Sequence, residues 1–348
     1  MKKLVFFTLA VVMIAGCKPS GKGNGKGVEM SGAGATFPLP YYNIIFKDYS
    51  EKTANQVTYG GIGSGGGIRS LQDKTVDFGA SDAYLSDEEK TEMQAEVLHI
   101  PTCLGAVALA YNLSGVQQLH LNGDLVAGIF MGNITKWNDA KIKELNPEAD
   151  LPDKPITPVY RSDGSGTTYV FSDYLTKVNQ EWAENMGTGK SLKWPVGIAA
   201  KGNPGVAGII QQTEGAIGYV GSEYSLSLNI PTASMQNSSG NFVDASTQSI
   251  SAAANIELPA DMCAMITNSP EAQAYPISCF TWIIVYKEQA YAKRTEEQAK
   301  ALVNLLEYVL SPAAQSVAEK VHYSPLPEAA LKNAKALVES ITYKGVKP

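Results

Sequence analysis

Three glycine-rich turns each place hydroxyl side chains where a helix is expected to begin. They span residues 32–38, 60–67 and 161–168 of the 348-residue chain, and in the first of them Thr36 is expected to cap the helix. At a helix start the backbone N–H groups lack partners and the helix dipole is positive, so an anion is favoured there. A tight connection without a ligand is the commoner meaning of one such turn. Three turns in one chain, one of them carrying Arg161, favour an anion-binding site.

The affinity of such a site must come from several donors that converge on the anion. A helix dipole contributes only about 0.3–1 kcal/mol, whereas micromolar binding requires about 8 kcal/mol. Hydrogen bonds to a charged group contribute roughly 1.5–3 kcal/mol each. The candidate donors are backbone N–H groups, the Arg161 guanidinium, which can bond two oxygens of a tetrahedral oxyanion, and the hydroxyls of Thr36, Ser64, Ser165 and Thr167.

Motifs typical of enzymes are either incomplete or leave the other glycine-rich turns without a role. Residues 61–66 read G-x-G-x-x-G, and Asp82 lies 21 residues beyond Gly61, as in dinucleotide-binding proteins. A nicotinamide cofactor is not expected outside the cytoplasm, however, and this reading leaves the other two turns without a role. Neither Ser64 nor Ser165 lies in G-x-S-x-G. An exported nucleotide-binding enzyme or phosphatase therefore stays only as an alternative, and we expect no cofactor and no metal.

The N-terminus predicts export and a lipid anchor. Lys2 and Lys3 precede a short apolar run over residues 4–14, which predicts a signal peptide over residues 1–16. Residues 14–17 resemble the bacterial lipoprotein cleavage box, in which Cys17 is lipidated; the alternative is an ordinary secretory signal with a chance cysteine. Residues 17–27 then form the lipidated cysteine and a flexible tether. We expect a membrane-anchored lipoprotein on the periplasmic or cell-surface face.

The rest of the chain has the pattern of an α/β protein. Strands are expected over residues 56–59 and 75–79, and continuous apolar runs over 106–111 and 281–286 are typical of strands covered on both faces. Thr295 and Gln298 form a capping-box pattern ahead of an amphipathic helix. The net charge of −6 argues against a nucleic-acid partner. Cys103, Cys263 and Cys279 allow one disulfide and one thiol, or three thiols.

The motifs together resemble the phosphate-binding proteins of bacterial high-affinity phosphate ABC importers. The similarity extends over about residues 30–346 and is carried by these segments: 32–38, 61–66, 76–82, 132–139, 161–167, 187–189, 193–197, 215–220 and 323–327.

This resemblance implies a type II periplasmic-binding-protein-like fold, with two α/β lobes joined by two crossing strands and the ligand between them. One lobe would combine residues 28–102 with 280–348, and the other would span 103–279. The protein would be a monomeric receptor and not an enzyme, and it would deliver inorganic phosphate to membrane permease subunits. Asp163 would orient Arg161. The implied phosphate ligands are Thr36, Phe37 through its backbone, Ser64, Asp82, Arg161, Ser165, Gly166 and Thr167.

Asp82 is the one implied ligand that should repel an anion. At 4 Å and an effective dielectric constant of 20, the repulsion is about 4 kcal/mol. The conflict disappears if the ligand donates a proton to the carboxylate, as phosphate can at neutral pH and sulfate cannot. We therefore hypothesise that Asp82 rejects sulfate. Two alternatives remain: Asp82 caps a turn over residues 81–83, or the protein binds another tetrahedral oxyanion such as sulfate or molybdate.

Overall fold

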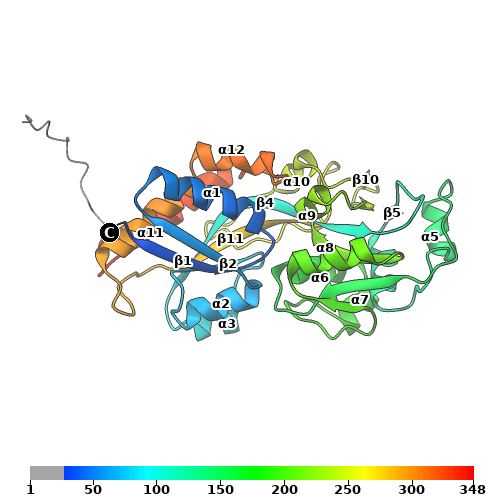
Figure 1. Cartoon of the computed structure of the whole chain (residues 1–348), viewed down its shortest axis with the longest axis horizontal. Coiled ribbons are helices and arrows are strands. Elements are labelled where there is room, and N and C mark those ends of the chain that lie inside the picture. Colours follow the sequence, from blue (N-terminus) through cyan, green and yellow to red (C-terminus); the bar gives the residue numbers. More distant parts are fainter. Residues whose placement is uncertain (1–26) are drawn as a thin grey trace, which may run out of the picture.

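An eight-stranded sheet runs through the whole protein (Figure 1). The computed structural model describes residues 27–348. The sheet and the helices on its faces confirm the prediction of an α/β fold. In their order across the sheet the strands are β2 (Gln56–Gly61), β1 (Glu29–Gly34), β3 (Phe78–Ser81), β11 (Ser278–Tyr286), β4 (Val97–Tyr111), β8 (Ala216–Gly221), β6 (Thr157–Arg161) and β7 (Ile198–Ala200).

Strands β4 and β11 run side by side through the middle of the sheet and join its two halves. Residues 97–106 of β4 pair antiparallel with β11, and residues 107–111 pair antiparallel with β8. All of β11 is buried, as is β4 beyond its first residue. The apolar runs over residues 106–111 and 281–286, which predicted strands covered on both faces, are thus parts of these two longer strands.

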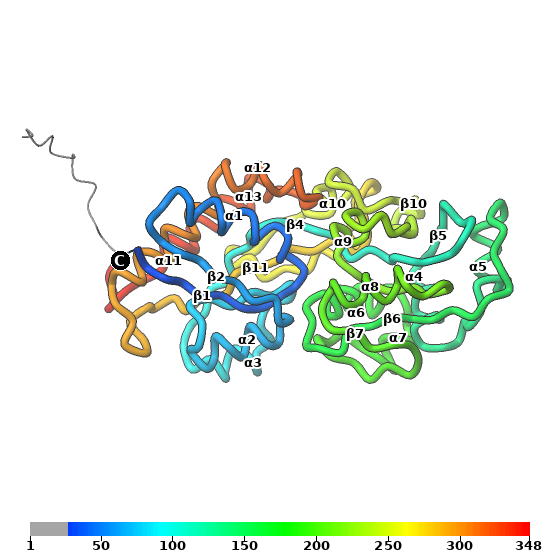
Figure 2. The backbone as a smooth tube through the Cα atoms, in the orientation of Figure 1, coloured from blue at the N-terminus to red at the C-terminus, as the bar shows by residue number. Residues whose placement is uncertain are grey.

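Each half of the sheet carries its own helices and forms one lobe (Figure 2). The first lobe contains strands β1–β3 with α1 (Leu39–Lys52), α2 (Ser64–Gln72), α3 (Asp87–Glu92), α11 (Glu296–Val309), α12 (Pro312–Lys320) and α13 (Glu328–Glu339). The second lobe contains β6–β8 with α4 (Gly123–Phe130), α5 (Ala140–Leu145), α6 (Gly166–Val178), α7 (Gln180–Asn185), α8 (Gly202–Gln212) and α9 (Ser222–Ser227).

The remaining elements lie between β8 and β11 along the chain, apart from one short strand. They are α10 (Thr247–Ala253) and a three-stranded sheet of β5 (His120–Leu121), β9 (Ser234–Gln236) and β10 (Phe242–Val243). Part of this region packs against the first lobe, because Trp282 Nε1 of β11 donates to the Met262 carbonyl at 3.1 Å. The division at residues 102/103 and 279/280 therefore stays a proposal.

Of the local predictions, the start of one strand was too early and one helix cap was wrong. Strand β3 begins at Phe78 and not at residue 75. Thr36 does not cap α1, whose N-cap is Pro38 without a side-chain hydrogen bond. The capping box of α11 is confirmed, with Thr295 accepting the Gln298 N–H and Gln298 accepting the Thr295 N–H.

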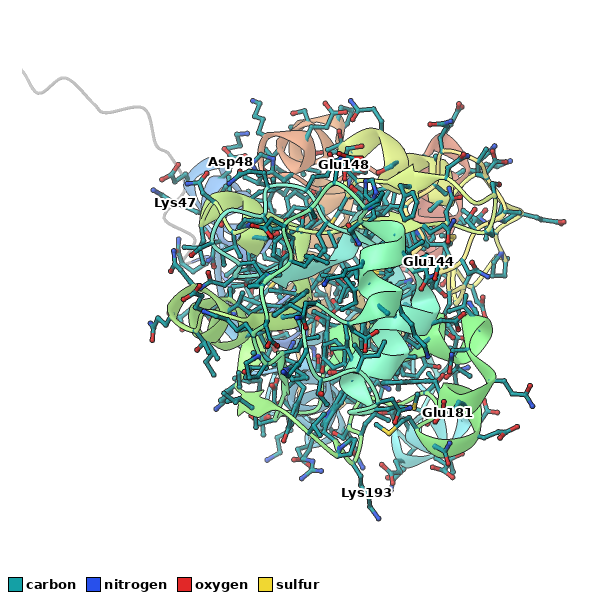
Figure 3. All side chains as sticks on the ribbon, turned by 90° about the vertical axis from the view of Figure 1, so that its right-hand side faces the viewer. Lys47, Asp48, Glu144, Glu148, Glu181 and Lys193 are labelled. Atoms are coloured by element: carbon teal, nitrogen blue, oxygen red, sulfur yellow. The ribbon has the colours of Figure 1, made fainter. Side chains whose placement is uncertain are left out.

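The thiols of Cys103, Cys263 and Cys279 are all free, which agrees with the three-thiol alternative. The predicted signal peptide and lipidated Cys17 lie outside the described residues. Within residues 27–348 no helix combines the length and the apolar character needed to cross a bilayer. At the end of the second lobe, charged side chains such as Glu144, Glu181 and Lys193 point outward (Figure 3).

Candidate functional site

The three glycine-rich turns lie at the carboxyl ends of strands, the edge where α/β sheets bind ligands. Thr36 and Phe37 follow β1, Ser64 begins α2 after β2, and Asp82 follows β3. These three strands are parallel neighbours, so their ends lie together. In the second lobe, Arg161 ends β6 and residues 165–167 begin α6. The implied phosphate ligands are all buried, including Asp82 at 1% and Arg161 at 4% exposure, whereas Asp163 is half-buried.

The turns from the two lobes contact each other directly. The Gly166 N–H donates to Ser64 Oγ at 2.9 Å, and the Gly65 N–H donates to the Gly164 carbonyl at 2.9 Å. A methyl group on Gly166 would lie 2.6 Å from both the Asp82 nitrogen and Ser64 Oγ, closer than real Cβ contacts. Glycine at position 166 is therefore what lets the two turns approach this closely.

Ser165 holds the beginning of α6. Its Oγ accepts the Thr168 N–H at 3.0 Å, which makes it the N-cap of the helix. Its own N–H donates to the Lys190 carbonyl at 2.8 Å. The cap fixes the direction of the first turn, whose amides would face an anion.

Asn203 links hydroxyl groups of the two lobes, and the sequence motifs did not point to it. Its backbone N–H and its side-chain Nδ2 both donate to Thr36 Oγ1, at 3.0 and 3.1 Å. Nδ2 also lies 3.2 Å from Thr167 Oγ1. With two donors on its oxygen, the Thr36 hydroxyl keeps its own proton to donate. The sequence feature that could have identified Asn203 is a fourth glycine-containing turn between a strand and a helix, here β7 and α8. Gly202 in this turn has a φ of 68°.

Asp82 is held by hydroxyl donors on both carboxylate oxygens. Thr281 Oγ1 of the crossing strand β11 donates to Oδ1 at 2.9 Å, and Thr167 Oγ1 lies 3.4 Å from Oδ2. Burial raises the pKa of Asp82 to about 7, against the lowering effects of the Thr281 hydrogen bond and of Arg161. Asp82 does not cap the turn over residues 81–83, because it is Ser81 Oγ that accepts the Ala83 N–H at 3.1 Å. Thr281 had no motif that could have identified it.

Arg161 forms an ion pair with Asp163, the residue that the resemblance proposes to orient it. Arg161 Nε and Nη2 donate to the two carboxylate oxygens of Asp163 at 2.8 and 2.5 Å. The Gly202 N–H donates to the same carboxylate at 3.0 Å. Burial opposes the charge, yet the Arg161 hydrogen bond holds the pKa of Asp163 below its ordinary value. The remaining nitrogen, Nη1, donates to Thr167 Oγ1 at 3.4 Å, and that hydroxyl in turn lies 3.4 Å from Asp82 Oδ2.

The backbone at Thr36 and Phe37 is fixed by two tyrosine hydroxyls. Tyr224 Oη of α9 donates to the Thr36 carbonyl, and Tyr323 Oη donates to the Phe37 carbonyl, both at 2.5 Å. The Phe37 side chain is fully buried and packs edge-on against Tyr323. Phe37 can therefore face the site only through its backbone. Because the Thr36 carbonyl and the Phe37 N–H belong to one peptide group, the Tyr224 bond also polarises that N–H.

The site has the donors for a small oxyanion and one buried acid. Among the described residues no group of three or more His, Cys, Asp or Glu side chains could hold a metal ion. His99 has a structural role, since its Nε2 accepts the Leu85 N–H at 3.1 Å and burial lowers its pKa to about 4.

Sequence comparisons identify related proteins along most of the chain. Residues 20–313 match the family model described as the PBP superfamily domain. A phosphate-binding protein PstS of Xylella fastidiosa (strain 9a5c) is 39% identical over 348 residues, covering 93% of this chain and 94% of the relative. That of Pasteurella multocida (strain Pm70) is 40% identical over 314 residues, covering 88% and 89%. The family resemblance inferred from the motifs is confirmed.

Solved structures share the fold. A high-affinity periplasmic phosphate-binding protein (PfluDING) bound with phosphate superposes with a TM-score of 0.72 at 22% identity, covering 89% of this chain and 93% of that one. A putative phosphate ABC transporter substrate-binding protein with bound phosphate, from Clostridium perfringens, gives a TM-score of 0.63 at 20% identity and covers 86% and 100%. These matches confirm the prediction of a two-lobed, type II fold.

Proposed function

Because the chain belongs to the PBP superfamily and, within it, to the family of the phosphate-binding protein PstS, we propose that it binds inorganic phosphate outside the cytoplasmic membrane and delivers it to an ABC-type import permease. The ligand lies between the lobes. The residues proposed to bind it are Thr36, the Phe37 backbone, Ser64, Asp82, Arg161, Ser165, Gly166 and Thr167.

The observation that carries the proposal is the convergence of turns from both lobes on one buried cluster of donors. Thr36, Ser64 and Asp82 come from the first lobe, and Arg161 and residues 165–167 come from the second. They are joined through Ser64–Gly166, Thr36–Asn203 and Asp82–Thr167 contacts. A tetrahedral oxyanion matches this set because it offers acceptors in several directions to donors that enclose it.

Asp82 supports phosphate over an oxyanion that carries no proton. HPO₄²⁻ still has one O–H to donate to the carboxylate, whereas SO₄²⁻ would bring two acceptors face to face. It is the ionised form of Asp82 that accepts this hydrogen bond, and the Thr281 hydroxyl and the Arg161 charge favour that form against the effect of burial. Arg161 supplies the opposite charge that keeps the anion bound.

We further propose that residues 1–16 are a signal peptide and that Cys17 is lipidated, which places the lobes on the outer side of a membrane. As a receptor, the protein would act as a monomer and would not catalyse a reaction. Labelling with a radioactive fatty acid in the native host tests the anchor, with Cys17→Ser as the variant that should lose the label.

Binding without turnover distinguishes the receptor from an exported phosphatase. Residues 28–348 are titrated calorimetrically with phosphate and then incubated with a phosphomonoester. The receptor saturates with one phosphate and releases no product from the ester. Release of phosphate from the ester by wild-type protein, lost in Arg161→Met, would establish the enzyme instead.

A further inference from the structure

One ion pair joins the two lobes outside the ligand cluster. Lys190 Nζ of the second lobe lies 2.5 Å from Glu89 Oε2 of helix α3 in the first lobe. Of the ion pairs found within residues 27–348, it is the one that spans the two lobes; the others lie within a single lobe. Any separation of the lobes would break it.

Both partners are held in place by their own lobe. Glu89 Oε2 also accepts the Ser86 N–H at 2.9 Å as part of the capping box of α3. On the other side, the Lys190 ammonium lies 5.7 Å from the centroid of the Tyr169 ring of α6. These contacts reduce the side-chain entropy that usually cancels the gain from a surface ion pair.

The pair lies close to the ligand cluster along the backbone. The Lys190 carbonyl accepts the N–H of Ser165, the N-cap residue of α6 and a proposed phosphate ligand. Only 15% of the Lys190 side chain and 25% of the Glu89 side chain are exposed. The attraction between the charges is therefore less screened by solvent than in an exposed pair.

We propose that Glu89 and Lys190 form a latch that stabilises the closed arrangement of the lobes and thereby slows the release of the bound oxyanion. This inference rests on the proposed function, because it concerns how long the same site retains its ligand. Neither latch residue belongs to the proposed phosphate-binding set; both are positioning residues. The pair forms only after the lobes meet, so it slows dissociation and leaves the association rate nearly unchanged.

Neutralising each partner separately distinguishes the latch from simple attraction of the anion by Lys190. If Lys190 only attracted phosphate, Glu89→Gln would leave the affinity unchanged or increase it, because it removes a negative charge. The latch predicts that Glu89→Gln and Lys190→Gln each raise the dissociation rate about five- to twentyfold. It also predicts that the double variant is little worse than either single variant.

Lys193→Gln is the matched control. Lys193 lies three residues further along, points outward (Figure 3) and takes part in none of the ion pairs found among the described residues. This variant removes the same charge from the same loop and should release phosphate at the wild-type rate. Thermal unfolding of each ligand-free variant verifies that the lobes remain folded.

The experiment is stopped-flow release of phosphate from residues 28–348 at several NaCl concentrations. We expect both latch variants to release phosphate faster than wild type. Salt should accelerate release less in the variants than in wild type, because they lack the ion pair that salt would screen. Wild-type release rates in Glu89→Gln would overturn the latch, and so would tighter binding by that variant. If wild-type protein binds no phosphate at all, the proposed function fails instead. In that case, small-angle scattering of wild type and Glu89→Gln still reports whether the pair favours compact lobes.

Discussion

Ser64 Oγ accepts the backbone N–H of Gly166 at 2.9 Å, although 102 residues separate the two along the chain. The bond joins the first turn of α2 in one lobe to the first turn of α6 in the other. Two helix N-termini therefore point at the same small volume, and the dipoles of both favour an anion there. The account of the site depends on this meeting of turns.

A methyl group at position 166 should abolish tight binding without unfolding the protein. In Gly166→Ala the Cβ would lie 2.6 Å from the Asp82 nitrogen and from Ser64 Oγ, so the lobes could not close fully. We expect phosphate affinity to fall at least 100-fold, since several charge-assisted hydrogen bonds of roughly 1.5–3 kcal/mol are misplaced together. Calorimetric titration measures the loss.

Gly208→Ala serves as the control for Gly166→Ala. Gly208 lies within α8, and a Cβ there would have no neighbour within 4 Å. Phosphate affinity should stay at the wild-type value, and the melting temperature should be unchanged or slightly higher, because alanine favours the helix. Wild-type affinity in Gly166→Ala would show that the turns need not meet for binding.

Asp82→Asn should weaken the discrimination against sulfate. The asparagine amide can donate to sulfate, which removes the repulsion between two acceptors. We expect sulfate to compete for the site at concentrations at least tenfold lower than in wild type. Competition of sulfate with labelled phosphate measures this change. Equal sulfate exclusion in both proteins would mean that selectivity lies elsewhere.

The buried Asp82 should also make the stability of the ligand-free protein depend on pH. Its folded-state pKa of about 7 lies above the ordinary value of 3.8, so the folded protein keeps a proton that the unfolded chain loses. The resulting stabilisation is fully present below about pH 4 and is lost as the pH rises through 7. A difference of about three pKa units corresponds to about 4 kcal/mol.

Asp82→Asn isolates that effect, because asparagine stays neutral at every pH. Burial also raises the pKa of Glu223, which changes stability in the same direction, but both proteins share this residue. The free energy of unfolding of wild type relative to the variant should therefore fall between pH 4 and 8. Denaturant titrations across this range measure it, and parallel curves for the two proteins would contradict a buried, proton-retaining Asp82.

Thr281 should affect binding although it belongs to a crossing strand. In Thr281→Val, Asp82 Oδ1 loses the hydroxyl that donates to it at 2.9 Å. We expect a roughly tenfold or larger loss of phosphate affinity, since a hydrogen bond to a charged group contributes roughly 1.5–3 kcal/mol. Thr281→Ser keeps the hydroxyl and should restore most of the affinity. If valine and serine bind alike, the Thr281 hydroxyl does not serve the site.

The sequence predicted what is local or is carried by a compact motif. The apolar runs over residues 106–111 and 281–286 predicted two strands covered on both faces, because such a strand needs apolar residues throughout. Thr295 and Gln298 predicted a cap because both partners lie within one turn. The turns that hold Ser64, Arg161 and Thr167 were found because glycine and hydroxyl residues recur there at helix starts.

What the sequence missed depends on contacts between distant residues. Asn203 and Thr281 are single residues whose partners are distant in the chain, so no spacing indicated them. Thr36 was expected to cap a helix, but its hydroxyl oxygen accepts the N–H of the distant Asn203 and makes no hydrogen bond at the start of α1. Strand β3 begins only at Phe78. Before it, the Ser31 N–H of β1 donates at 2.7 Å to the Asp77 carboxylate and not to a backbone carbonyl, so the strand pairing does not extend to residue 75.

The most direct test of the central claim is a calorimetric titration of residues 28–348 with phosphate and, separately, with sulfate at neutral pH. The account predicts saturation by one phosphate per chain with micromolar or tighter affinity, and at least 100-fold weaker binding of sulfate. Equal affinity for the two anions, or no saturable binding of phosphate, would contradict it.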